Sequence, residues 1–154
     1  MNEFQDRRTI QKIVLNAHTV AIVGLSASEL RASHFVGYYL QRHGYRVIPV
    51  NPNEELVLGE HVYPSLRDVP ERIDVVDVFR DPAAVPEIAR EAVEVGASAL
   101  WLQFGVISPE GARIAQEGGL AVVMDRCLKV EHARLLGRMH WMGFDTGVIA
   151  GARR

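Results

Sequence analysis

Hydrophobic positions along this chain follow two spacings, one typical of amphipathic helices and one typical of buried strands. Near the start, an apolar residue recurs every three or four positions, which predicts a helix over residues 6–17 with one apolar face. Its apolar positions are Ile10, Ile13, Val14 and Ala17. Short continuous apolar runs indicate strands that are buried on both faces, as in a parallel sheet. Such runs occupy residues 19–24, 45–50, 73–79, 98–104 and 120–124, and a short extra strand near an edge is expected over 61–63.

Helical patterns separate these strands. Ser33 is suited to cap a helix that ends at Gly44. Asp81 and Ser108 are each followed by proline, a combination typical of a helix start, and a last helix is expected over 130–136. The positions of the first of these helices that we expect to face the core are Phe35, Val36, Tyr39 and Leu40.

The alternation of strands and helices determines the predicted fold class. It is typical of βαβ crossovers and of an α/β protein. We therefore expect a Rossmann-like, doubly wound, mainly parallel sheet in a three-layer α/β/α sandwich. The 154 residues are expected to form a single domain, with a core over about 19–136, an added N-terminal helix and an added tail over 137–154.

Composition narrows the class of partners. The net charge of −2 argues against broad, non-specific binding to nucleic acids or to acidic membranes. The only cysteine, Cys127, excludes a disulfide framework. No apolar run approaches the length of a membrane span, and the first residues lack the core of a signal peptide. We therefore expect a soluble cytoplasmic protein that binds neither nucleic acid nor membrane.

The loop after the first predicted strand is the strongest candidate for a binding site. In doubly wound sheets, ligands bind beyond the carboxyl ends of the strands. This loop combines Gly24 with serine hydroxyls and with Arg31, directly before a predicted helix. Backbone N–H groups and the helix dipole favour an anion there, typically a phosphate. Arginine adds a forked cation, so the loop predicts a phosphate site.

The loop does not carry the fingerprint of a site for NAD. That fingerprint needs glycines at 24, 26 and 29, whereas this chain has Ser26 and Glu29 at the last two positions. The acidic residue that binds the ribose is also missing from the end of the second strand, which continues into Asn51 and Pro52. The nucleotide is therefore expected to be held in another way.

Six motifs follow one another in the order of one known family. They are residues 20–26 (VAIVGLS), 31–33 (RAS), 44–52 (GYRVIPVNP), 77–80 (DVFR), 101–105 (WLQFG) and 123–127 (VMDRC). Together they resemble the stand-alone CoA-binding domain proteins, which are similar to the N-terminal CoA-binding domain of the succinyl-CoA synthetase alpha subunit. The resemblance covers most of the chain, from about Val20 to His132.

The resemblance implies that coenzyme A is the ligand. The glycine–serine loop and the Arg-x-Ser element would hold the pyrophosphate, and the Asn-Pro turn and Phe-Arg pair would flank the adenosine and its phosphate. Gln103, at the end of a buried strand, is a further candidate that either faces the ligand or bonds to neighbouring loops. The residues expected to bind CoA are Gly24, Leu25, Ser26, Ala27, Arg31, Ser33, Asn51, Pro52, Phe79, Arg80 and Gln103.

Catalytic and metal-binding roles are not expected. Cys127 is interpreted as structural, with a redox site or a mixed disulfide with CoA as the alternative. Asp74 and Asp77 lie at opposite parity on a strand, so they do not form a catalytic pair, and Asp77 is expected to hold a loop. The histidines lack the spacing of metal ligands.

The function expected from the sequence is binding of CoA or an acyl-CoA without catalysis by this chain. Two alternatives remain open. One is a small NAD(P)- or CoA-dependent enzyme, and the other is a ligand-binding subunit of a larger CoA ligase. Whether the chain associates with itself or with another protein is left open.

Overall fold

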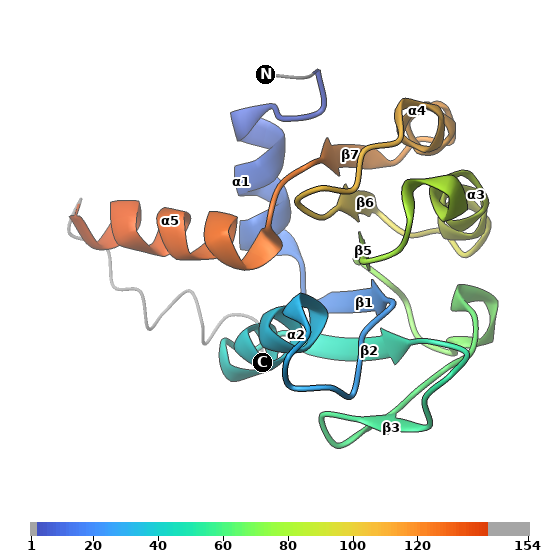
Figure 1. Cartoon of the computed structure of the whole chain (residues 1–154). Coiled ribbons are helices and arrows are strands. Elements are labelled where there is room, and N and C mark those ends of the chain that lie inside the picture. Colours follow the sequence, from blue (N-terminus) through green and yellow to red (C-terminus); the bar gives the residue numbers. More distant parts are fainter. Residues whose placement is uncertain (1–2, 142–154) are drawn as a thin grey trace.

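A five-stranded parallel sheet lies between two layers of helices (Figure 1). A computed structural model describes residues 3–141 of the chain. The sheet has the order β2-β1-β5-β6-β7. Its strands are β1 (Thr19–Val23), β2 (Arg46–Val50), β5 (Val75–Val78), β6 (Ala99–Leu102) and β7 (Ala121–Met124). The helices are α1 (Arg7–Asn16), α2 (Ala32–Arg42), α3 (Val85–Glu94), α4 (Pro109–Glu117) and α5 (Leu128–Trp141). The predicted α/β fold is confirmed.

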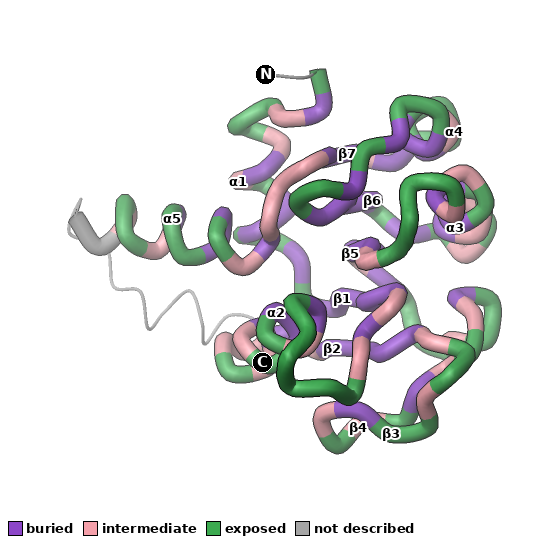
Figure 2. Tube along the Cα trace, viewed as in Figure 1, coloured by how far each residue is buried: buried purple, intermediate pink, exposed green. Residues whose placement is uncertain are grey.

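The core is divided by the sheet into two apolar clusters, because alternate side chains of each strand point to opposite faces. The strands themselves are mostly buried between the helices (Figure 2). One cluster joins the sheet to α3 and α4, with Val76 and Val78 among its strand residues. The other joins the opposite face to α1, α2 and α5, with Ile22 and Trp101 among its fully buried residues. Burial on both faces explains why the strands appear in the sequence as continuous apolar runs.

The order in which successive strands are added to the sheet reverses next to β1. From β1 the chain first passes to β2 at one edge and then returns to β5 on the other side. In open α/β sheets such a reversal opens a crevice at the carboxyl ends of the strands. The loops after β1 and β5 meet there, and this topology positions the candidate site.

The start of α2 differs from the prediction. Arg31, rather than Ser33, is the N-cap, and Ser33 lies buried in the first turn. Its hydroxyl accepts a hydrogen bond from the backbone N–H of Ser26 and is therefore engaged by the preceding loop. Phe35 was expected in the core but is 59% exposed, because it lies just outside the narrow apolar stripe formed by Val36 and Leu40.

Three further segments refine the prediction. The edge strand expected over 61–63 is a small hairpin of β3 (Leu56–Val57) and β4 (Glu60–His61), followed by a bridge from Tyr63 to Val50. Helix α5 is longer than expected, and the part of the predicted tail beyond Trp141 lies outside the described residues. The segment after Asp81 begins as a 3-10 helix (Pro82–Ala84) before α3.

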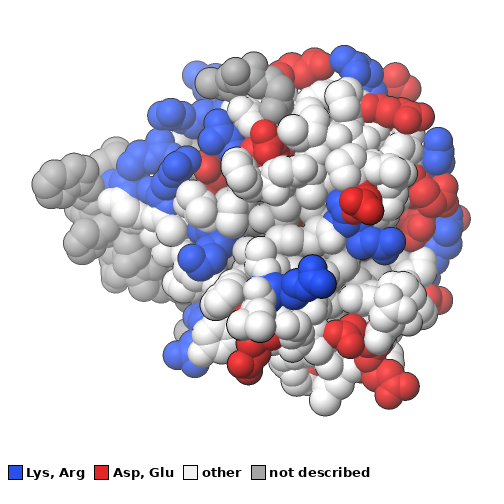
Figure 3. Space-filling view, viewed as in Figure 1, with Lys and Arg blue, Asp and Glu red and all other residues white. Residues whose placement is uncertain are grey.

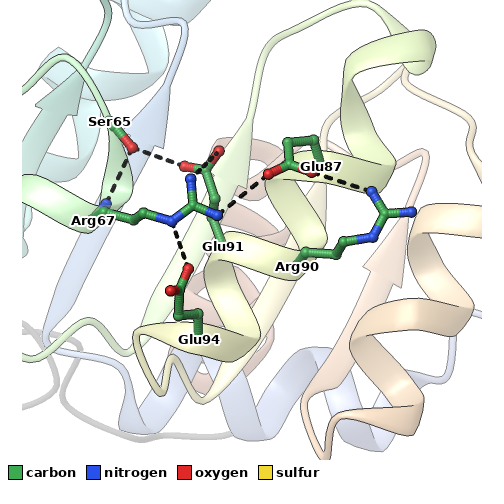
Figure 4. A network of polar contacts seen from close by, with 6 residues as sticks. All are labelled: Ser65, Arg67, Glu87, Arg90, Glu91 and Glu94. Atoms are coloured by element: carbon green, nitrogen blue, oxygen red, sulfur yellow. Dashed lines mark hydrogen bonds and ion pairs between the residues drawn. The ribbon is translucent and has the colours of Figure 1, made fainter.

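A network of ion pairs ties the connection before β5 to α3 (Figure 4). Arg67, in a 3-10 helix (Leu66–Asp68), contacts three glutamates of α3, at 2.5 Å from Glu94, 3.3 Å from Glu87 and 3.6 Å from Glu91. The Ser65 hydroxyl donates to Glu91 at 3.0 Å. The arginine holds the pKa of Glu87 below its usual range. These contacts lie on the side of the sheet that carries α3.

Candidate functional site

A cavity of about 430 Å³ opens at the carboxyl ends of β1, β2 and β5, and we call it the first cavity. Eight of the eleven residues expected to bind CoA line it, together with two that were not predicted, Ala32 and Asn53. The eight are Gly24, Ser26, Arg31, Ser33, Asn51, Pro52, Phe79 and Arg80. The parallel sheet brings them together because all of its strands end at this edge.

Gly24 allows the loop after β1 to turn into this cavity. Its φ of +91° is in the region that favours glycine, and its N–H donates to the carbonyl of Val50 at 2.8 Å. A Cβ at this position would collide with the backbone carbonyl of Phe79 and would approach the Arg80 side chain. The glycine therefore permits the loops after β1 and β5 to lie against each other.

Side-chain oxygens hold the rest of this loop in place. The N–H of Ser28 donates to the Ser26 hydroxyl at 3.0 Å, and the N–H of Ala27 donates to a carboxylate oxygen of Glu54 at 2.6 Å. Ala27 therefore presents its backbone to Glu54 and does not line the cavity. Glu54 was not singled out from the sequence, since a carboxylate in a turn carries no signal of a long-range contact.

Asn51 links the loop after β2 to the loop after β1. Its Nδ2 donates to the carbonyl of Leu25 at 3.1 Å, and its Oδ1 accepts from the N–H of Asn53 at 2.9 Å. The Leu25 side chain is fully buried beneath α2, so only its backbone belongs to this loop. The Asn-Pro turn predicted from the sequence thus shapes one wall of the cavity and brings Asn53 into its lining.

Positive charge gathers at the first cavity. None of the ten described residues that line it is acidic, whereas Arg31 and Arg80 are both among them. Among the described side chains, neither arginine forms an ion pair with a carboxylate. Helix α2 begins at the same place, and its N-cap residue, Arg31, makes no side-chain capping bond. The cavity therefore offers two guanidinium groups and a helix N-terminus to an anion.

A second cavity, of about 660 Å³, adjoins the first and shares Ala32 and Phe79 with it. Gln103 lies here rather than in the first cavity, and its Oε1 accepts the N–H of Leu128 at 3.1 Å. Of the two roles predicted for Gln103, the structure thus provides the contact to a neighbouring segment and also places the residue at a cavity wall. The free thiol of Cys127 is a half-buried part of the same lining.

Asp77 of β5 and Trp101 of β6 are register partners on adjacent strands. They lie on the face of the sheet that α1, α2 and α5 cover. The Trp101 side chain is fully buried, and its indole N–H donates to the carbonyl of Arg126 at 2.8 Å. Asp77 is also fully buried, but neither of its carboxylate oxygens has a hydrogen-bond partner in the described part of the chain. The expectation that Asp77 holds a loop is therefore wrong, since its strand position directs the carboxylate into the core. Burial raises the pKa of Asp77 well above its usual range.

Asp74 has a different environment from Asp77. Its carboxylate accepts the N–H groups of His18 and Thr19, at 2.8 and 2.9 Å. The two aspartates therefore do not face each other, as their opposite parity along the strand predicts. Within residues 3–141, no group of three or more potential metal ligands comes together, and no helix is long and apolar enough to cross a membrane.

Sequence comparison connects this chain to proteins of two sizes. An uncharacterized protein of Bacillus subtilis, YneT, is 39% identical over 124 residues, which cover 80% of this chain and 92% of that protein. The ADP-forming acetate–CoA ligase II of Archaeoglobus fulgidus is 27% identical over 100 residues, which cover 64% of this chain but only 15% of the ligase. The chain therefore corresponds to most of the first relative and to a small part of the second.

Solved structures with the same fold include two of similar size. The PH1109 protein redesigned for binding is 44% identical and superposes with a TM-score of 0.83, covering 84% of this chain and 92% of that one. A hypothetical protein of Pyrococcus horikoshii is 39% identical with the same TM-score, covering 89% of this chain and all of that one. These neighbours confirm the Rossmann-like arrangement.

The family follows from the extent of the match. The model of the CoA binding domain family covers residues 18–133, which include β1 to β7 and all loops of the first cavity. Helix α1 precedes the matched region, and α5 extends past its end. The resemblance predicted from the six motifs is thereby confirmed, and the chain belongs to the CoA binding domain family.

Proposed function

We propose that this protein binds coenzyme A or an acyl-CoA, with the phosphates of the ligand in the first cavity and without catalysis by this chain. One observation carries the proposal. The first cavity combines two arginines that lack an acidic partner in the described part of the chain with the uncapped start of α2. CoA contains a pyrophosphate and a 3′-phosphate, and guanidinium groups and helix N-termini are suitable partners for both. Membership of the CoA binding domain family supports the same ligand.

Each part of the cavity has a role in this proposal. Ser26, Ser33 and Arg31 hold the pyrophosphate at the start of α2. The Ser33 hydroxyl already accepts from Ser26, so its own proton remains available to donate to a phosphate oxygen. Asn51, Pro52 and Phe79 flank the adenosine, and Arg80 binds the 3′-phosphate.

In this proposal the pantetheine arm of the ligand occupies the second cavity. Ala32 and Phe79 border both cavities, so the pantetheine arm leaves the first cavity past these residues and enters the second. Gln103 then lies along the arm. The proposed compartment is the cytoplasm, where the single thiol of Cys127 stays reduced.

Isothermal titration calorimetry of the purified protein, stripped of any bound ligand, tests the proposal directly. CoA and NAD are titrated in parallel. We expect micromolar binding of CoA and no heat from NAD, because the loop after β1 lacks the second and third glycines of the NAD fingerprint. Binding of NAD with no binding of CoA would overturn the proposal in favour of a dinucleotide-dependent enzyme.

Arg31 is expected to contribute a large part of the affinity for phosphate. Replacing Arg31 by alanine should weaken CoA binding by about tenfold or more, the size of one charge-assisted hydrogen bond. Calorimetry checks the change, and the control is Arg90→Ala, which removes an exposed arginine from α3 on the opposite face. Equal affinity of the Arg31 variant and the wild type would remove Arg31 from the site.

Arg80 is expected to distinguish CoA from its dephospho form. Dephospho-CoA lacks the 3′-phosphate, so it should bind the wild type more weakly than CoA does. In the Arg80→Ala variant the two ligands should bind equally, since the group that recognises the phosphate is gone. If the difference between the ligands persists in the variant, the 3′-phosphate is bound elsewhere.

A further inference from the structure

The second cavity leads away from the first toward a cleft between α1 and α5. This cleft, which we call the arginine cleft, has a volume of about 600 Å³. It shares four lining residues with the second cavity, Gln5, Arg126, Glu131 and Arg134. The three spaces therefore follow one another along the carboxyl edge of the sheet, from the loops after β1 to the helices α1 and α5.

The arginine cleft carries excess positive charge. Among the described residues, four arginines line it, Arg7, Arg126, Arg134 and Arg138, against two carboxylates. Figure 3 shows Lys and Arg atoms gathered beside α1 and α5. Arg7 comes from α1 and Arg138 from α5, so the packing of these two helices brings together residues from opposite ends of the chain.

Both carboxylates of the cleft already have partners. Asp6 caps α1 by accepting the N–H and the hydroxyl of Thr9, each at 2.9 Å, and these bonds lower the pKa of Asp6. Glu131 is buried and pairs with Arg134 at 3.0 Å. Among the described side chains, Arg7 and Arg138 have no ion pair. Their guanidinium groups are therefore available to an external anion.

Arg126 adds a guanidinium group whose hydrogen bonds to the described residues are incomplete. One of its terminal nitrogens donates to Oε1 of Gln5 at 3.2 Å, but its Nε is buried and has no hydrogen-bond partner in the described residues. Because a buried donor without an acceptor costs free energy, such a group is usually satisfied by water or by a ligand. Arg126 lies where the second cavity and the arginine cleft meet.

We propose that the arginine cleft receives the terminal carboxylate of a dicarboxylic acyl group carried on CoA. This inference rests on the proposed function, because it requires the pantetheine arm in the second cavity. Phe104 and Val130, both exposed at the second cavity, provide apolar surface for the methylene groups of such an acyl chain. The forked guanidinium groups beyond them match the geometry of a carboxylate.

Matched acyl-CoA ligands test this inference by calorimetry. Glutaryl-CoA and valeryl-CoA have acyl chains of equal length and differ only in the terminal carboxylate. We expect the wild type to bind glutaryl-CoA about fivefold to tenfold more tightly, as two partly exposed ion pairs allow. The preference should weaken as salt is added. The double variant Arg7→Gln/Arg138→Gln should lose it while keeping its affinity for CoA, and the control Arg90→Gln should retain it.

Failure of the inference differs from failure of the proposed function. If CoA binds and the two acyl-CoAs bind equally to the wild type, the carboxylate role is wrong although the CoA site stands. A preference that survives in the double variant would also overturn it, because the carboxylate would then lie elsewhere. Binding of free glutarate or inorganic phosphate to the cleft, with no preference between the acyl-CoAs, would make the cleft a separate anion site. If no CoA species binds, the proposed function itself fails.

Discussion

Replacing Asp77 by asparagine is expected to stabilise the protein relative to the wild type, by an amount that grows as the pH rises above about 4. Asp77 is fully buried, neither of its oxygens has a hydrogen-bond partner in the described residues, and burial raises its pKa well above the usual range. In the unfolded chain the same carboxyl ionises near pH 4. Between these two pKa values, the folded protein keeps a proton that the unfolded chain releases.

The sign of the effect follows from this difference in bound protons. Below about pH 4 both states are protonated, so the carboxyl imposes no pH-dependent penalty. As the pH rises toward the raised pKa, the unfolded state is increasingly favoured, by about 1.4 kcal/mol for each pH unit. Asparagine does not titrate and avoids this loss.

Urea unfolding of the wild type and the Asp77→Asn variant over a series of pH values measures the difference. The free energies of unfolding should nearly coincide near pH 4, which provides an internal control, and should diverge above it. Parallel pH profiles for the two proteins would contradict the burial of an unpaired carboxyl at this position.

The fold was predictable because both faces of the sheet are covered. A strand between two helical layers needs apolar side chains at every position, so the runs that end at Gly24 and at Phe79 stand out from the helical spacing around them. Asp77 is the exception inside such a run. Its position on the strand was predicted correctly, but the absence of a partner depends on what α1, α2 and α5 place above it, and periodicity does not report that.

The candidate site was predictable to the extent that it depends on strand ends. Gly24, Asn51 and Phe79 each follow a strand, and a parallel sheet necessarily brings such positions to one edge. The direction of each loop side chain was not predictable. Ala27 turns its N–H to Glu54, and Leu25 packs beneath α2, because tertiary contacts rather than local preferences decide these orientations.

The arginine cleft lies beyond prediction from spacing. Arg7 and Arg138 stand far apart in the sequence, and each alone is typical of a solvated helix surface. They line one cleft because the apolar face of α1, with Ile10 and Ile13, packs in the same cluster as Leu135 of α5. The apolar stripe of α1 was correctly predicted, whereas its partner helix could be identified only from the structure.

Replacing Gly24 by alanine is the second change for which we expect a large effect, a loss of about 2–5 kcal/mol in the free energy of unfolding. Two costs add at this position. The φ of +91° is unfavourable for any residue with a Cβ, and that Cβ would collide with the carbonyl of Phe79, a backbone atom of a strand end that cannot move aside. Gly96 is the matched control, since its φ of +75° is also positive but no atom lies within 4 Å of an added Cβ. The Gly96→Ala variant should therefore lose only the conformational term, about 1–2 kcal/mol.

Urea unfolding of the two alanine variants separates the cost of the positive φ from the cost of the collision with Phe79. Calorimetry of the folded fraction of Gly24→Ala then measures whether the collision also weakens CoA binding. Relief of the collision requires the loops after β1 and β5 to separate, and these loops carry Ser26 and Arg80, which both line the first cavity. We therefore expect CoA affinity to fall in Gly24→Ala and to remain unchanged in Gly96→Ala. Equal losses of stability in the two variants would show that the loops after β1 and β5 can move apart at no cost in free energy. The close approach of the strand ends would then not be what holds the first cavity in shape.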